Sequence, residues 1–112
     1  MFGLFKKVAF SSVPKELRPV LNAAFPGGEK QLEQEAKGLL ENFPDLFTLE
    51  SSRSLVVWAK SMWVTNTDRS RSFHDMCEAI NRHEKNRLTN DECVAICSRI
   101  LEQDFATRKN II

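Results

Sequence analysis

The stretch Leu88-Thr-Asn-Asp-Glu-Cys-Val-Ala-Ile-Cys97 carries the sharpest local signal in the chain. Thr89 and Glu92 have the spacing of a capping box, in which each side chain bonds the backbone N–H of the other residue. Leu88 stands before the box, where a hydrophobic staple would reach the first turn. The next apolar residues share one helical face: Cys93, Cys97, Ile100 and Leu101. These features predict a helix from the Thr89 cap to about Ala106.

A second helix is predicted immediately upstream, from about Ser72 to Lys85. Its apolar residues again fall on one face: Phe73, Met76, Cys77 and Ile80. Residues 86–88 are a turn between the two helices. A short connection between two amphipathic helices predicts an antiparallel hairpin.

Two further helices are predicted in the first half of the chain. The earlier one starts near Pro14, which suits a first helical turn, and is stopped by Pro26-Gly27-Gly28. The later one runs from about Glu29 to Phe43 and places its leucines on one stripe. Glu33 and Lys37 are spaced for an i,i+4 ion pair on the exposed side of this helix.

The segment 46–65 is ambiguous from sequence. Leu55-Val-Val-Trp-Ala-Lys-Ser-Met-Trp-Val64 is apolar nearly all round, so it suits a buried helix or a buried strand. Its β-branched and aromatic residues favour strand, whereas the lack of alternation favours helix. We predict a helix here, with an α+β fold containing a small hairpin at 46–65 as the alternative.

The predicted fold is therefore all-α, with about five helices in one compact domain over residues 13–106. Residues 1–12 are expected to form an apolar and basic arm packed on the body, with a weak membrane anchor as the alternative. Residues 107–112 are expected to fray. A length of 112 residues suits a single domain.

Composition excludes several functional classes. The chain has 16 basic and 15 acidic residues, and its net charge of +1 gives no electrostatic case for nucleic acid or for an anionic membrane. It contains no apolar run of about 18 residues, which a membrane span needs. Its start, with apolar residues before Lys6 and Lys7, is the reverse of a secretory leader. We expect a cytoplasmic protein.

A zinc-like spacing joins His74 and Cys77 to Cys93 and Cys97. On an antiparallel hairpin Cys77 and Cys97 are level, but His74 and Cys93 are displaced in opposite directions, so the four positions span about 10 Å of helix. Such a set cannot close around one ion. We expect the cysteines to fill the core, with no metal or cofactor. A zinc site and a Cys77–Cys97 redox pair remain as alternatives.

Two other activities are weighed and disfavoured. A helix-turn-helix over 72–106 would present Asn90-Asp91-Glu92 to DNA phosphates, where readers use donors and basic residues. For catalysis, His74 and Glu78 are the one histidine–acid pair on a shared helical face, which is more typical of a surface pair. No phosphate-binding loop or nucleophile elbow is present. The sequence therefore predicts no enzyme.

The remaining signal is a cluster of large apolar side chains beside a basic loop. One helix face cannot bury the side chains of Trp58, Met62 and Trp63 together. Arg69 and Arg71 follow in the loop, and a large apolar side chain left exposed is typical of a binding surface. We expect these five residues to bind another protein or a second copy of this chain. The predicted function is that of a small adaptor, regulator or inhibitor-like protein, such as an immunity protein or an antitoxin.

Overall fold

The computed structural model describes residues 14–111, except for the side chains of Arg69, Asn110 and Ile111. Within this range the fold is all-α, as predicted, and the alternative of a hairpin at 46–65 is wrong. A short 3-10 helix, Lys15–Leu17, precedes five α-helices: α1 (Arg18–Ala24), α2 (Gly28–Asn42), α3 (Leu49–Thr65), α4 (Arg69–His83) and α5 (Asn90–Ile111). The predicted arm at 1–12 lies outside the described residues.

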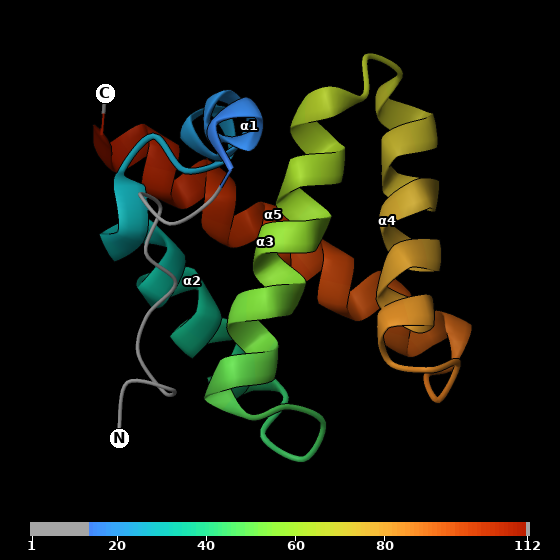
Figure 1. Ribbon diagram of the computed structural model, residues 1–112. Coiled ribbons are helices and arrows are strands. Elements are labelled where there is room, and N and C mark those ends of the chain that lie inside the picture. The colour runs from blue at the N-terminus through green and yellow to red at the C-terminus, as the bar shows by residue number, and fades with distance from the viewer. Residues whose placement is uncertain (1–13, 112) are drawn as a thin grey trace.

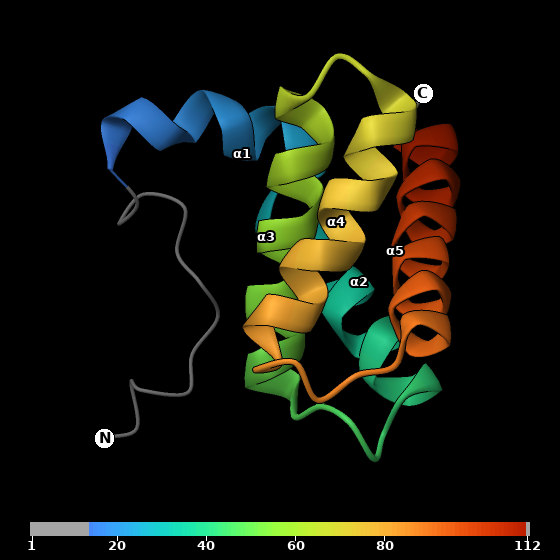
Figure 2. The same cartoon turned by 90° about the vertical axis from the view of Figure 1, so that its right-hand side faces the viewer.

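Helix α3 occupies the centre of the fold. It packs against α1, α2, α4 and α5. Figure 1 shows α3 and α4 side by side, with α5 crossing behind α3, and Figure 2 shows the turn that joins α4 to α5. Helices α4 and α5 contact each other as the predicted hairpin requires. A central helix needs apolar residues on several sides, which explains why 55–64 shows no simple alternation.

Local capping explains where these helices begin. Thr89 N donates to Glu92 Oε1 at 2.8 Å and Glu92 N donates to Thr89 Oγ1 at 3.1 Å, so the predicted capping box is confirmed. A second box starts α3, where the Thr48 hydroxyl accepts from Ser51 N at 3.1 Å. Asp68 caps α4 by accepting from Arg71 N, which starts this helix at Arg69 rather than at the predicted Ser72.

The core lies between the helices and draws on each of them. Its fully buried apolar side chains include Leu32 and Leu39 of α2, Leu55 and Val56 of α3, and Ile100 of α5. Burial from several sides outweighs the strand propensity of the β-branched residues in α3. The cysteines contribute as predicted, because two of the three are buried and the third is partly buried.

Two expectations about the helices are corrected. Glu33 does not pair with Lys37, which is exposed. Instead, the Glu33 side chain is buried and accepts two hydrogen bonds from Arg53 of α3, at 2.6 and 3.0 Å. Helix α5 also continues past Ala106 to Ile111, through residues expected to fray. Arg108 in this last part of α5 donates to backbone carbonyls of α1, which holds the end of α5 against the body.

Candidate functional site

An exposed tryptophan marks one surface of the α3–α4 layer. Trp58 is 44% exposed, and its ring centroid lies 5.6 Å from that of His83 on α4, with an interplanar angle of 57°. Together with Ser54 and Val57 these two residues line a hollow of about 310 Å³. Aromatic side chains left this open on a folded domain are a common feature of binding surfaces.

A larger hollow of about 710 Å³ adjoins the first one. Its walls are residues 44–48 with Ser51, from the connection into α3, and residues 83–85 with Arg87, from the end of α4. His83 lines both hollows, so they adjoin at this side chain. We call the two hollows together the His83 groove. It combines apolar side chains, among them Leu46 and Phe47, with charged groups of both signs.

The polar groups of the groove are organised around Glu84. This carboxylate is mostly buried; Oε2 lies 2.9 Å from His83 Nδ1 and Oε1 lies 2.5 Å from Arg87 Nη2. Arg87 Nε also donates to the Glu84 carbonyl at 3.0 Å. Glu84 therefore holds the His83 and Arg87 side chains at the edge of the groove. The hydroxyls of Thr48 and Ser51, which also line the groove, are engaged in the α3 capping box.

The predicted partner-binding residues do not form one patch. Met62 and Trp63 are partly buried and pack against the core, whereas Trp58 lies at the groove. Arg71 is exposed, with Nε 3.8 Å from Asp75 Oδ2, and stands about 18 Å along α4 from His83. The side chain of Arg69 lies outside what the structure describes. Trp58 is thus joined by His83 and Glu84, which the sequence pattern did not single out.

Cys77 of α4 and Cys97 of α5 lie next to each other, at the same height along the two helices, as predicted. The Sγ atoms of Cys77 and Cys97 are 3.5 Å apart. His74 points to the surface, where it pairs with Glu78 at 3.6 Å. Across the described part of the chain, no group of three or more His, Cys, Asp or Glu side chains is placed to hold a metal ion. Burial raises the pKa of the Cys93 and Cys97 thiols, and the neighbouring Cys77 raises both further.

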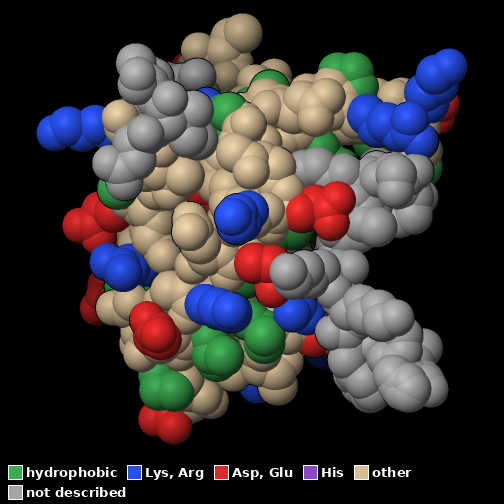
Figure 3. All heavy atoms as spheres, turned by 90° about the vertical axis from the view of Figure 1, so that its left-hand side faces the viewer, with side chains coloured by type: hydrophobic (Ala, Val, Ile, Leu, Met, Phe, Trp, Pro, Cys, Tyr) green, Lys and Arg blue, Asp and Glu red, His purple; other side chains and the backbone are tan. Residues whose placement is uncertain are grey.

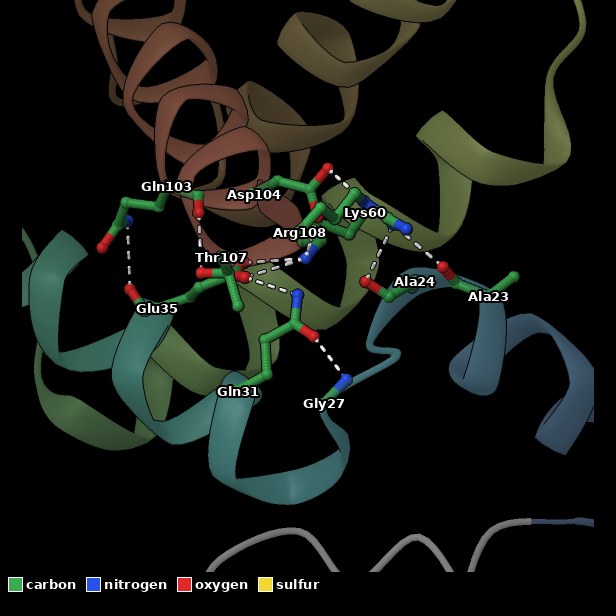
Figure 4. A network of polar contacts seen from close by, with 10 residues as sticks. All are labelled: Ala23, Ala24, Gly27, Gln31, Glu35, Lys60, Gln103, Asp104, Thr107 and Arg108. Carbon is green, nitrogen blue, oxygen red and sulfur yellow. Dashed lines mark hydrogen bonds and ion pairs between the residues drawn. The ribbon is translucent and has the colours of Figure 1, made fainter. Parts of the chain in front are cut away.

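Sequence analysis missed a buried ionic network around Lys60. This side chain is wholly buried, and its ammonium lies 2.9 and 3.0 Å from the oxygens of Glu35 and 2.5 Å from Asp104 Oδ1. Both carboxylates are equally buried. Figure 4 shows the three side chains converging from α2, α3 and α5. The Phe25 ring centroid lies 4.3 Å from the ammonium, in a cation–π contact.

A second layer of hydrogen bonds extends this network to α1. Arg108 Nε donates to Asp104 Oδ2 at 2.8 Å, and Arg108 Nη2 donates to the carbonyls of Ala23 and Ala24. On the other side, Gln31 donates to Glu35 at 2.8 Å and accepts from the backbone N–H of Gly27. Lys60 and Arg108 therefore form ion pairs with the carboxylates of Glu35 and Asp104. The network ties α1, α2, α3 and α5 together, and the almost complete burial of Lys60, Glu35 and Asp104 indicates a structural role.

The pKa of Glu35 is raised from its ordinary value of 4.5, chiefly by burial, although Lys60 opposes the shift. The folded protein therefore holds the Glu35 proton to a higher pH than the unfolded chain does. The stability from this proton is fully present below about pH 4.5 and is lost as pH rises through the raised pKa. Glu35→Gln cannot titrate, so its free energy of unfolding relative to the unmodified protein should rise across this window.

Urea unfolding of both proteins from about pH 4 to about pH 8 checks this expectation. A difference between the two proteins that stays constant with pH would show that Glu35 titrates alike in the folded and unfolded states. Gln31→Leu serves as a companion variant: it removes a hydrogen bond that favours the ionised Glu35 carboxylate, so the pKa of Glu35 and the pH at which this stability is lost should both rise further.

The face of the molecule drawn in Figure 3 shows no dominant charge. On the face of the molecule in Figure 3, Lys and Arg side chains are interspersed with Asp and Glu. Among the described helices, none has the length and apolar character needed to cross a membrane. Comparison of the chain with protein-family models, curated proteins and solved structures finds no significant match. Support for a function therefore comes from the groove and the residues around it.

Proposed function

We propose that this protein is a protein-binding module, an adaptor, regulator or inhibitor-like protein, that captures its partner at the His83 groove. The observation that carries the proposal is Trp58, which remains 44% exposed beside a hollow in a fold that buries most of its large apolar side chains. Tryptophan is the residue type most enriched among binding hot spots.

The lining of the groove suits a protein segment that inserts an apolar side chain next to Trp58. Val57 and Phe47 supply apolar surface, and Glu84, Lys85 and Arg87 supply a polar edge. An apolar centre with a polar rim is the usual composition of a protein–protein interface. Because both signs of charge occur at this edge, the proposed partner segment is mixed in charge.

The other predicted residues have secondary places in this proposal. Met62 and Trp63 pack against the core and hold α3, and with it Trp58, in position. Arg71 is a candidate peripheral contact, since it is exposed at the opposite end of α4. The zinc and helix-turn-helix alternatives gain less support. No metal-holding group occurs among the described residues, and the N-terminus of α5 presents acidic side chains.

Trp58→Ala is expected to weaken partner binding by at least about 30-fold, which corresponds to about 2 kcal/mol. The tagged protein is captured gently at natural expression level, the partner is identified by native mass spectrometry, and its affinity is then measured by calorimetry. Phe105→Ala is the matched control, because Phe105 is an aromatic residue 58% exposed on α5 and absent from the groove lining.

Both variants are first checked for native helix content and melting temperature by circular dichroism. The proposal fails if Trp58→Ala binds the purified partner as tightly as the unmodified protein does. It fails equally if the unmodified protein is recovered without a stoichiometric partner, or if Phe105→Ala loses as much affinity as Trp58→Ala.

A further inference from the structure

Two cysteines on different helices are already in contact in the folded protein. Cys77 of α4 and Cys97 of α5 are 20 residues apart in the chain, and their Sγ atoms are 3.5 Å apart. A disulfide bond is about 2.05 Å long, so the two sulfurs need to approach by only about 1.5 Å. We propose that Cys77 and Cys97 are a modification site, at which a small-molecule disulfide such as oxidised glutathione produces a reversible cross-link between α4 and α5.

The third cysteine shows that the pairing is specific. Cys93 is also buried on α5 and lies one turn from Cys97, about 6 Å along the helix axis. Of the two α5 thiols, Cys97 is the one whose sulfur contacts Cys77 in the described structure. Cys93 is thus a cysteine on the same helix as Cys97 and is similarly buried, but it lies one turn away along α5. It therefore serves as an internal control for the contact geometry.

Exposure determines where the reaction begins. Cys77 is partly exposed, whereas Cys97 has no exposed surface. The Cys77 thiolate attacks one sulfur of oxidised glutathione and expels one glutathione thiolate, which leaves a mixed disulfide on Cys77. The deprotonated Cys97 then attacks the Cys77 sulfur and expels the second glutathione. The two cysteine thiols are oxidised, and one glutathione disulfide is reduced to two thiols.

The second step is expected to be the slow one. Burial raises the pKa of Cys97, so little of its reactive thiolate is present at neutral pH. The contact with Cys77 compensates, because the attacking sulfur is held beside its target. Below the pKa of Cys97, each rise of one pH unit should speed ring closure about tenfold.

The cross-link would fix the position of α4 on α5. Helix α4 carries His83, which forms part of the groove, but the proposal does not depend on any function of that groove. Closing a loop of this size restricts the unfolded chain. The oxidised protein is therefore expected to melt roughly 10 °C above the reduced protein.

The folded protein is incubated with oxidised glutathione at several pH values, quenched with an alkylating agent, and weighed intact. The expected product has lost two hydrogens, retains one alkylatable thiol, and yields a cross-linked peptide joining Cys77 to Cys97. Cys93→Ser should form the same cross-link at a similar rate. Cys97→Ser should stop at the mixed disulfide on Cys77, and dithiothreitol should reverse both products.

Three results would overturn the proposal. One is a cross-linked peptide that contains Cys93 instead of Cys97. Another is a mixed disulfide on Cys77 that never closes in the unmodified protein, even at high pH. The third is loss of thiols only under conditions in which circular dichroism shows the helices to be unfolded. Peptide mapping of the unmodified protein decides these points even if Cys97→Ser does not fold.

Discussion

Replacing Lys60 with methionine is expected to lower the free energy of unfolding by about 3–5 kcal/mol. The ammonium of Lys60 is the shared counterion of Glu35 and Asp104, and all three side chains are almost completely buried. Methionine fills a similar volume but leaves Glu35 without a cation. A domain of this size typically has about 5–15 kcal/mol of stability, so urea unfolding should show a large shift of the midpoint.

Two further variants separate charge loss from general damage to the helices. Lys37→Met is the matched control, because Lys37 is exposed on α2, and it should change stability by less than about 0.5 kcal/mol. In the double variant Glu35→Gln with Lys60→Met, part of the loss should be recovered, since Asp104 keeps its partner Arg108. Equal effects of Lys60→Met and Lys37→Met would contradict a stabilising role for the network.

Local sequence signals were sufficient to predict most of the helices. The Thr89–Glu92 capping box, the apolar stripes and the Pro26-Gly27-Gly28 break act between residues close in the chain, so they can be recognised without a tertiary structure. The predicted start of α4 at Ser72 is three residues too late, because the prediction does not use Asp68 as the cap. Helix α3 remained ambiguous because its apolar residues face several neighbours at once.

The ionic network could not be predicted in the same way. The sequence shows that Lys60 interrupts the apolar run Leu55–Val64, and this was the available signal that a charge would be buried. Its partner Glu35 is 25 residues earlier, and Asp104 is on the last helix. Only the packing of α2, α3 and α5 brings them together. The groove could not be predicted for the same reason, because Trp58 and His83 are brought together only by the packing of α3 against α4.

A second buried pair provides the other large expected effect. Arg53 of α3 donates from Nε and Nη2 to the two carboxylate oxygens of Glu33 on α2, and both side chains are about nine-tenths buried. Arg53→Met should lower the free energy of unfolding by about 2–4 kcal/mol, because it leaves Glu33 unpaired. The expected effect is somewhat smaller than for Lys60, since water retains some access to this pair.

Other arginine variants show whether charge or geometry is responsible. Arg53→Lys keeps the positive charge but loses the bidentate hydrogen bonding to Glu33, so it should retain only part of the free energy of unfolding that Arg53 contributes. Arg71 is exposed, and its Nε lies 3.8 Å from Asp75 Oδ2. The Arg71→Met variant should therefore unfold at nearly the same urea concentration as the unmodified protein. If Arg53→Met were as mild as Arg71→Met, the contact between α2 and α3 would rest on apolar packing alone. A large loss that Glu33→Gln partly reverses would instead show that the Arg53–Glu33 pair itself stabilises the contact between these helices.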